Sequence, residues 1–288
     1  QIGISALMKY FSIILSTIII SIQFKFNLYI SDQSDAYYFR SYARAILEPL
    51  PKNSLLLVNY DMQWTSLRYI NQCEGYRSDV TLINLSMMTY EWFHNKRVLY
   101  PNYTWPGTYL AAPTSNAVKH KNKNIGNGKE KAFTLTQFLD SNVMNGIPIY
   151  IGGKTSHDDP ELTKKYEMVP TGLVTRFVPM SAVPNATIYS PYLSSNWQYV
   201  LKNLNILPDL KKYTEETWEW TIGRDFKDRI VETSAFYLQL AISGAANNCD
   251  PEPLVNAVYW LESALLLENI AKSRPSTALL KNLGLGHL

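Results

Sequence analysis

The stretch "NYDMQWTSLRYINQCEGYRSDV", residues 59–80, lies between two short apolar runs and decides the fold. The runs, residues 55–58 and 80–83, do not alternate in polarity and end in polar turns, which is typical of strands buried on both faces. Between them, apolar side chains recur every three residues, at Trp64, Leu67, Ile70 and Cys73. Gly75 follows at the position that favours a left-handed helix cap. The stretch therefore predicts a β-α-β unit with parallel strands.

The same pattern recurs further along the chain. In "TLTQFLDSNVMNGIPIYIGG", Thr134 can cap a helix that ends at residues 145–146, and a strand follows at residues 147–151. Another strand is predicted at residues 173–178, and a helix that ends before Pro51 precedes the first strand. Alternating strands and helices predict an α/β fold, an open and mostly parallel sheet with flanking helices.

From Pro191 onward the hydrophobic period becomes helical. Thr214 is the predicted cap of a first long helix, a second helix is expected to start at Asp250 and Pro251, and a third near Pro275. The apolar face of the first helix comprises Trp218, Ile222, Phe226, Ile230, Tyr237 and Ala241. Paired helices of this length resemble a tetratricopeptide-like α-helical region, here truncated because fewer than about three repeats are visible.

The N-terminal residues 6–24 are almost entirely apolar and approach the roughly 20 residues that cross a bilayer. A transmembrane helix is favoured over a cleaved signal peptide, because no small-residue cleavage pattern follows Ile22. We predict a transmembrane helix at residues 1–26, an α/β domain at residues 27–190 and the helical region at residues 191–288. Because the first residue is Gln and the last helix looks cut off, we expect an interior piece of a longer protein.

The composition excludes several classes of protein. At 288 residues and 46% apolar content the chain is globular, and a net charge of +3 does not indicate a nucleic-acid partner. The positive balance is set largely by the lysine-rich residues 119–133, which are typical of a solvated loop, with a lipid-headgroup or acidic-partner patch as the alternative. The two cysteines, Cys73 and Cys249, leave a single disulfide open.

Two motifs suggest chemistry and are rejected. Residues 152–155, "GGKT", follow a strand as a phosphate-binding loop would, but Pro148 replaces the required first glycine. The run "HDD" at residues 157–159 could offer metal ligands, but an acidic residue before Pro160 is an ordinary helix start, and no other histidine completes a site. We therefore predict neither a metal nor a cofactor in this chain.

Asp61 is the best single binding candidate, since it follows the carboxyl end of the first strand, where open α/β sheets place ligand-contacting residues. Arg77 and Asp79 are its expected neighbours. The alternative is structural: Asp61 caps the following helix, and Arg77 pairs with Asp79 or Glu74 to fix the return turn. Candidate N-glycosylation sites are Asn84, Asn102 and Asn185, at about the frequency that chance gives.

Residues 50–93 resemble the hallmark segment of the transmembrane protein 260 family of protein O-mannosyltransferases. The features that carry the resemblance are Pro51, Asp61, Tyr69, Cys73, Glu74, Arg77, Asp79, Val80, Met88, Tyr90, Glu91 and Trp92. The segments "IPIYIGGK", "VPTGLVTRFVP", "EETWEW" and "KNLGLGHL" extend it, in order, over most of the chain. The lysine-rich residues 119–133 depart from the family's pattern.

The resemblance implies a membrane glycosyltransferase of the GT-C class in the endoplasmic reticulum, with dolichyl-phosphate mannose as donor and Ser or Thr of folded, plexin-type receptor β-sandwich domains as acceptor. This chain would be the last membrane span and the lumenal C-terminal part, serving acceptor recognition or scaffolding. The catalytic acidic residue would lie upstream, so the chain alone is expected to be inactive. The alternatives are a non-catalytic, membrane-anchored interaction module and an α/β enzyme with a small ligand at Asp61.

Overall fold

The computed structural model describes residues 2–31, 37–111, 132–153, 159–204, 213–244, 251–270, 280–282 and 284. The chain divides into two compact units, residues 1–37 and 38–288. The first unit contains one helix, α1 (Ile2–Ser31), in which Leu7–Leu28 has a mean hydropathy of 1.7 and no buried residue. Its length and composition fit the predicted membrane span, although an N-terminal signal sequence would pass the same test.

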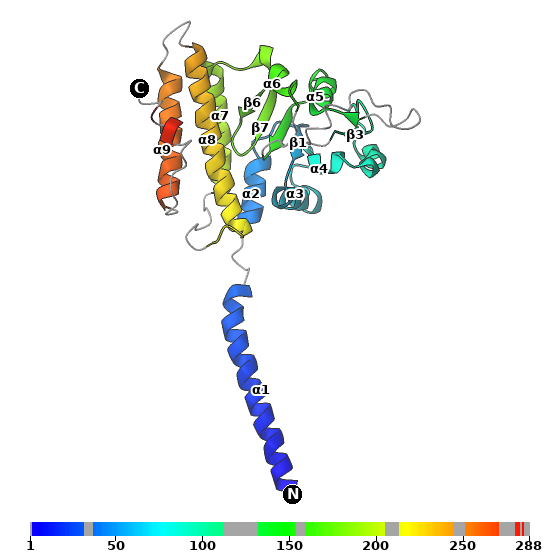
Figure 1. Ribbon diagram of the computed structural model, residues 1–288, viewed down its shortest axis with the longest axis vertical. Helices are drawn as coiled ribbons and strands as arrows, with labels where there is room; N and C mark the ends of the chain where they lie inside the picture. Colours follow the sequence, from blue (N-terminus) through cyan, green and yellow to red (C-terminus); the bar gives the residue numbers. More distant parts are fainter. Residues whose placement is uncertain are drawn as a thin grey trace. The chain divides into compact units, whose positions relative to one another are not determined.

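A five-stranded sheet forms the centre of the second unit (Figure 1). Its strands, in the spatial order β2-β1-β5-β7-β6, are β2 (Thr81–Asn84), β1 (Leu55–Val58), β5 (Ile149–Gly152), β7 (Thr175–Pro179) and β6 (Tyr166–Pro170). β1 pairs in parallel with β2 and with β5, whereas β7 runs antiparallel to both β5 and β6. The α/β prediction is confirmed, but the sheet is mixed, with as many antiparallel as parallel pairings.

The predicted β-α-β unit is present. α3 (Asp61–Arg68) continues into one wider π-helical turn, η1 (Tyr69–Cys73), before the chain enters β2. Gly75 has a φ of 67°, so it occupies the left-handed conformation expected for the residue that ends this helix. The helix packs its apolar stripe on the sheet, and β1 and β2 are parallel as the pattern predicts.

An antiparallel hairpin at one edge of the sheet was not predicted. The prediction assigned the residues after Pro160 to a helix, but α6 covers only Leu162–Lys165 and β6 starts directly after it. The hairpin turns at Gly172, which has a φ of 102°, so β7 starts two residues later than the predicted strand. β6 shows no clear alternation because an edge strand has fewer buried positions to reveal its period.

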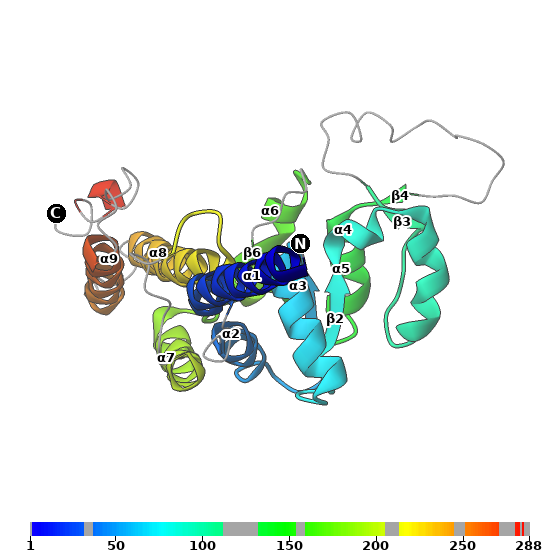
Figure 2. The ribbon, with the colours of Figure 1, turned by 90° about the horizontal axis from the view of Figure 1, so that it is seen from below.

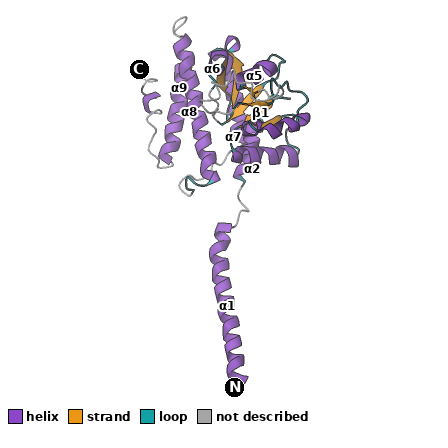
Figure 3. Cartoon of the chain, turned by 45° about the vertical axis from the view of Figure 1, so that its right-hand side comes forward, coloured by secondary structure: helices purple, strands orange, loops and turns teal. Residues whose placement is uncertain are grey.

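Helices cover both faces of the sheet (Figures 2 and 3). Along β1, Leu56 and Val58 face α2 (Tyr38–Leu47), α3 and the C-terminal helices, whereas Leu55 and Leu57 face the opposite side. That opposite side is covered by α4 (Leu85–Met88) and α5 (Leu135–Val143). Thr134 caps α5 as predicted and forms a capping box with Gln137. Smaller elements are η2 (Glu91–Leu99), β3 (Tyr109–Leu110), β4 (Ala132–Phe133) and η4 (Met180–Ala182).

Three long helices follow the sheet: α7 (Ala186–Asn203), α8 (Trp218–Gly244) and α9 (Glu252–Ile270). α8 starts one turn later than predicted, because Thr217 rather than Thr214 accepts the hydrogen bond of the first turn, from the Trp220 amide. The predicted apolar face of α8 is largely buried and joins the same core as α2. α8 and α9 pack side by side as one helix pair, which does not establish a tetratricopeptide-like array.

Several parts of the sequence analysis fall outside the described residues. Among them are the cap at Asp250, the start of a helix near Pro275, residues 154–158 and most of the lysine-rich residues 119–133. The segment boundaries at residues 26 and 190 stay predictions, although α7 runs across the second of them.

Candidate functional site

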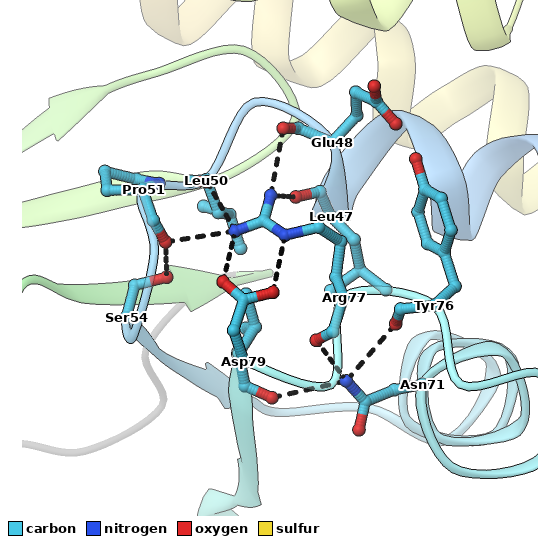
Figure 4. A network of polar contacts seen from close by, with 10 residues as sticks. Leu47, Glu48, Leu50, Pro51, Ser54, Asn71, Tyr76, Arg77 and Asp79 are labelled. Carbon is cyan, nitrogen blue, oxygen red and sulfur yellow. Dashed lines mark hydrogen bonds and ion pairs between the residues drawn. The ribbon is translucent and has the colours of Figure 1, made fainter.

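Arg77 occupies the turn that leads into β2, and its guanidinium is fully engaged (Figure 4). Nε and Nη2 each donate to one oxygen of the Asp79 carboxylate, both at 2.8 Å. The remaining hydrogen bonds go to main-chain carbonyl oxygens, those of Leu47, Glu48, Leu50 and Pro51, at 2.7 to 3.1 Å. A guanidinium has five N–H donors, so none is left for a ligand.

This arginine ties the end of α2 to the start of β2. Arg77 has a φ of 52°, an uncommon conformation for a residue with a side chain, and Asn71 Nδ2 holds the turn by donating to the Arg77 carbonyl at 2.6 Å. The hydrogen bonds from Arg77 lower the pKa of Asp79 below its ordinary value. Glu74 pairs instead with Arg40 at 2.9 Å. The geometry corresponds to the structural alternative, in which Arg77 pairs with Asp79 to fix the return turn.

Asp61 lies elsewhere. It is the first residue of α3 and exposed, Tyr60 holds the cap position without a side-chain hydrogen bond, and the Asp61 carboxylate bonds to no described residue. Because β1 and β2 are parallel, with Leu55 opposite Thr81, Asp61 lies at the carboxyl edge of the sheet and Asp79 at the amino edge. The sequence candidates therefore do not form one site. A binding role for each stays a prediction.

The carboxyl ends of β1 and β5 form the topological switch point of the sheet. β1 is flanked by β2 and β5, and the helices that connect to these neighbours, α3 and α5, cover opposite faces. In open α/β sheets the crevice at such a point is the usual place for a ligand. Here a Cβ on Gly152 would lie 2.1 Å from Oε1 of Gln63, and Gly153 has a φ of 82° and lies against the Tyr60 ring. Glycine at both positions lets the two segments approach.

Next to the switch point lies a buried polar cluster, which α2, α3 and α8 build together. Tyr42 donates to Oδ2 of Asp225, and Tyr60 donates to the same oxygen at 3.2 Å. The two tyrosine hydroxyls are 2.8 Å apart, and Gln63 Nε2 donates to the Tyr42 hydroxyl at 3.1 Å. Burial raises the pKa of Asp225, opposed by Arg229 and the tyrosine donors, and burial likewise raises the pKa of Tyr42 and of Tyr60.

Arg229, one turn after Asp225 on α8, connects this cluster to a pocket. Its side chain is 3% exposed; Nη1 donates to Thr175 Oγ1 at 3.2 Å and contacts a Glu232 carboxylate oxygen at 2.6 Å. Nε is 4.0 Å from Asp225 and has no acceptor among the described residues. Burial disfavours its charge, but the carboxylates of Glu232 and Asp225 outweigh burial and raise the pKa of Arg229.

The pocket has a volume of about 440 Å³ and opens between α8 and the strands β5, β7 and β6. Its lining is mostly apolar, with Glu167, Glu232 and Arg229 as the charged side chains, so it carries a net negative charge. The other lining residues are Ile151, Gly153, Met168, Pro170, Thr175, Ala235, Phe236 and Gln239. This mostly apolar cavity with a few polar groups, which begins beside β5, is the best candidate site in the described part of the chain.

Sequence reasoning missed this cluster because its members lie far apart: Tyr42 and Asp225 are 183 residues apart. One local signal was available. Asp225 and Arg229 interrupt the apolar face of α8 formed by Ile222, Phe226 and Ile230, and charges on a buried face indicate a specific polar contact.

The candidate glycosylation residues differ in their surroundings. Asn84 is 4% exposed and its side-chain oxygen caps α4 by accepting from the Met87 amide. Asn185 is exposed and caps α7, accepting from the Ile188 amide, and Asn102 is exposed in a turn. Cys73 is an exposed free thiol, whereas Cys249 lies outside the described residues.

Comparisons with known proteins give a consistent result. The family model described as TMEM260-associated domain 2 matches residues 39–146. The protein O-mannosyl-transferase tmem260 of Dictyostelium discoideum is 29% identical over 75% of this chain, and its counterpart in Mus musculus is 27% identical over 76%. These matches cover 24% and 29% of the two relatives, so the chain spans about a quarter of their length. No solved structure matches the chain.

Proposed function

Because the chain belongs to the TMEM260 family, we propose that it is the lumenal C-terminal region of an endoplasmic-reticulum membrane protein O-mannosyltransferase. The whole protein transfers mannose from dolichyl-phosphate mannose to Ser or Thr hydroxyls of folded receptor domains, of the plexin-type β-sandwich kind. This region recognises or positions the acceptor, and a tetratricopeptide-like helical part continues it. The observation that carries the proposal is similarity to O-mannosyltransferases over three quarters of the chain.

The reaction assigns different tasks to different parts of such a protein. A carboxylate takes the proton of the acceptor hydroxyl while its oxygen bonds to the anomeric carbon, and the polyprenyl phosphate leaves. We place that carboxylate outside this chain. What the described residues offer is a mostly apolar pocket with a few charged side chains, a feature that suits binding of a partner. Recognition is therefore the task that the geometry supports best.

A reconstitution experiment tests the division of labour. The full protein, the full protein without residues 38–288, and the 288-residue chain alone are each incubated with dolichyl-phosphate mannose and a folded acceptor domain. Mass spectrometry of the acceptor is expected to detect mannose with the full protein, strongly reduced transfer after the deletion, and none with the chain alone. Turnover by the chain alone would contradict the proposal.

The same experiment separates the alternative, a membrane-anchored interaction module without catalysis. Such a module would bind a partner domain through residues 38–288, but the full protein would transfer no mannose to it. Binding with transfer supports the transferase, and binding without transfer supports the module.

Lumenal placement has an independent test in the candidate glycosylation residues. Asn102 and Asn185 are exposed, so each Asn→Gln change is expected to remove one endoglycosidase-sensitive mobility shift from protein expressed in cells. Asn84, which is buried and caps α4, is the internal comparison and is expected to carry no glycan. An unmodified protein with both exposed sites intact would argue against the lumenal side.

A further inference from the structure

The edge strand β6 has a main-chain position that its own sheet does not use. In the β6–β7 hairpin, the Thr171 amide donates to the Val174 carbonyl at 2.8 Å. Hydrogen-bonded pairs alternate with non-hydrogen-bonded pairs along an antiparallel ladder. Counting from Thr171, the hydrogen-bonded pairs are therefore Val169 with Arg176 and Glu167 with Val178. The N–H and C=O groups of Tyr166, Met168 and Pro170 then point away from β7.

Among those three residues, only Met168 keeps both groups unused within the described structure. The Tyr166 amide donates to the Leu162 carbonyl, and the Pro170 carbonyl accepts from the Tyr189 hydroxyl at 2.9 Å, while Pro170 has no N–H. Met168 has no such partner, and it is 41% exposed. One outward-facing residue can exchange two hydrogen bonds with one residue of an added antiparallel strand.

The pocket described above adjoins this edge. Met168 and Glu167 both line it, and so do Glu232, Phe236 and Gln239 of α8, which packs against β6 (Figure 1). Along a strand successive side chains face opposite sides, so a ligand strand that pairs with Met168 presents alternate side chains to the pocket. The pocket's carboxylates outnumber its single arginine, which favours a cationic side chain there.

We infer that β6 and α8 form a recognition groove for an extended protein segment, which adds as a strand at Met168 and places a basic side chain beside Glu167 in the pocket. That the segment belongs to the mannose acceptor rests on the proposed function; the groove itself does not. This assigns both a class of ligand and a mode of binding to the pocket.

Peptides test the mode of binding on the 288-residue chain in detergent micelles. The probe is a fluorescein-labelled octapeptide of alternating Thr and Val with Arg at one central position. One comparison peptide has N-methyl groups on alternate amides, and another has Glu in place of Arg. Fluorescence anisotropy is expected to show each comparison peptide binding about tenfold or more weakly. Equal binding of all three, or no binding of the Arg peptide at millimolar concentration, would overturn the inference.

A charge-reversal variant tests the location. Glu167→Lys is expected to weaken the Arg peptide about tenfold and to strengthen the Glu peptide, and this exchange of preference cannot result from misfolding. Glu91→Lys makes the same change at an exposed residue of η2, which does not line the pocket, and should alter neither affinity. If both variants behave alike, the peptide binds somewhere else.

A backbone variant tests the pairing itself. Met168→Pro removes the outward N–H but no bond of the β6–β7 ladder, and proline is tolerated at such an edge position. We expect it to weaken the Arg peptide about tenfold, whereas Met168→Leu binds like the unchanged chain. Thermal unfolding of both variants identifies a folding defect, and a folded Met168→Pro chain with full affinity would contradict strand addition.

The groove and the proposed function can fail separately. If Glu167→Lys abolishes peptide binding while the full protein still modifies its acceptor normally, the groove is a peptide site but not the acceptor site. If the full protein transfers no mannose at all, the proposed function fails whatever the peptides do.

Discussion

Two arginine–aspartate pairs among the described residues of the second unit differ in how completely their hydrogen bonds are satisfied. Arg77 and Asp79 form a bidentate pair at 2.8 Å, and the same guanidinium binds four main-chain carbonyls. Arg229 and Asp225 approach only to 4.0 Å, the Arg229 Nε has no described acceptor, and Asp225 relies on two tyrosines. The first pair is a closed structural clamp, whereas the second borders a pocket.

This comparison shows why residue type alone misleads. An arginine near an aspartate in the sequence fits either a structural pair or a binding site, and the number of donors still unused decides whether a ligand can be bound. By that criterion the pair on α8, and not the pair in the opening β-α-β unit, belongs to the candidate site.

Removal of the clamp should have the largest effect on stability. Arg77→Ala leaves four carbonyls and a carboxylate without their donor, and we expect a loss of about 4 kcal/mol in the free energy of unfolding. Urea unfolding followed by circular dichroism measures it. Arg40→Ala is the matched control: its ion pair with Glu74 is exposed, so less than about 1 kcal/mol should be lost. Similar losses in both variants would refute the clamp.

The pocket pair should respond differently to single and double substitution. Arg229→Met leaves Asp225 buried without its cation, and we expect a loss of about 2 to 3 kcal/mol because the tyrosine donors remain. Adding Asp225→Asn removes the uncompensated charge, so the double variant should be more stable than Arg229→Met. If the loss in the double variant equals the sum of the losses in Arg229→Met and Asp225→Asn, the two residues are not coupled.

The two aspartates should also differ in their dependence on pH. The pKa of Asp79 is lowered in the folded state by Arg77, so its stabilising contribution is present above about pH 4 and is lost as the pH falls. The pKa of Asp225 is raised by burial, so its effect has the opposite sign: stability is lost as the pH rises above about 4, through the folded pKa.

Matched amide variants measure this difference. Between about pH 3 and 7, Asp79→Asn should lose most stability relative to the unchanged chain at neutral pH, and the difference should shrink on acidification. For Asp225→Asn, the free energy of unfolding of the unchanged chain should rise relative to that of the variant as the pH falls. Parallel pH profiles of the two variants would show that the aspartates lie in equivalent environments.

The smallest effect is expected at Asp61. Its carboxylate is exposed and contacts no described residue, so Asp61→Asn should change the free energy of unfolding by less than about 0.5 kcal/mol. If Asp61 binds acceptor or donor, mannose transfer by the full protein falls at unchanged stability. Unchanged transfer, together with a clear loss of stability, would instead support a role in starting the helix.

The sequence allowed the local units to be predicted and left the long-range ones open. Gly75, the helix cap at Thr134 and the buried run at β1 are read from neighbouring residues, and all three are confirmed. The antiparallel direction of β7 depends on a short turn at Gly172, and the prediction placed no strand on the other side of that turn. The polar cluster needs α2 and α8 to meet, which no local period can reveal.

The close contact between Gly152 and Gln63 has a consequence for how relatives can differ. A Cβ at position 152 would collide with the end of the Gln63 side chain, so a larger residue at 152 requires that side chain to move or to be shorter. We expect the two columns to covary in an alignment of relatives: a larger residue at 152 should accompany a shorter one at 63. Such paired exchange would show that relatives keep the close approach of β5 and α3 at the switch point.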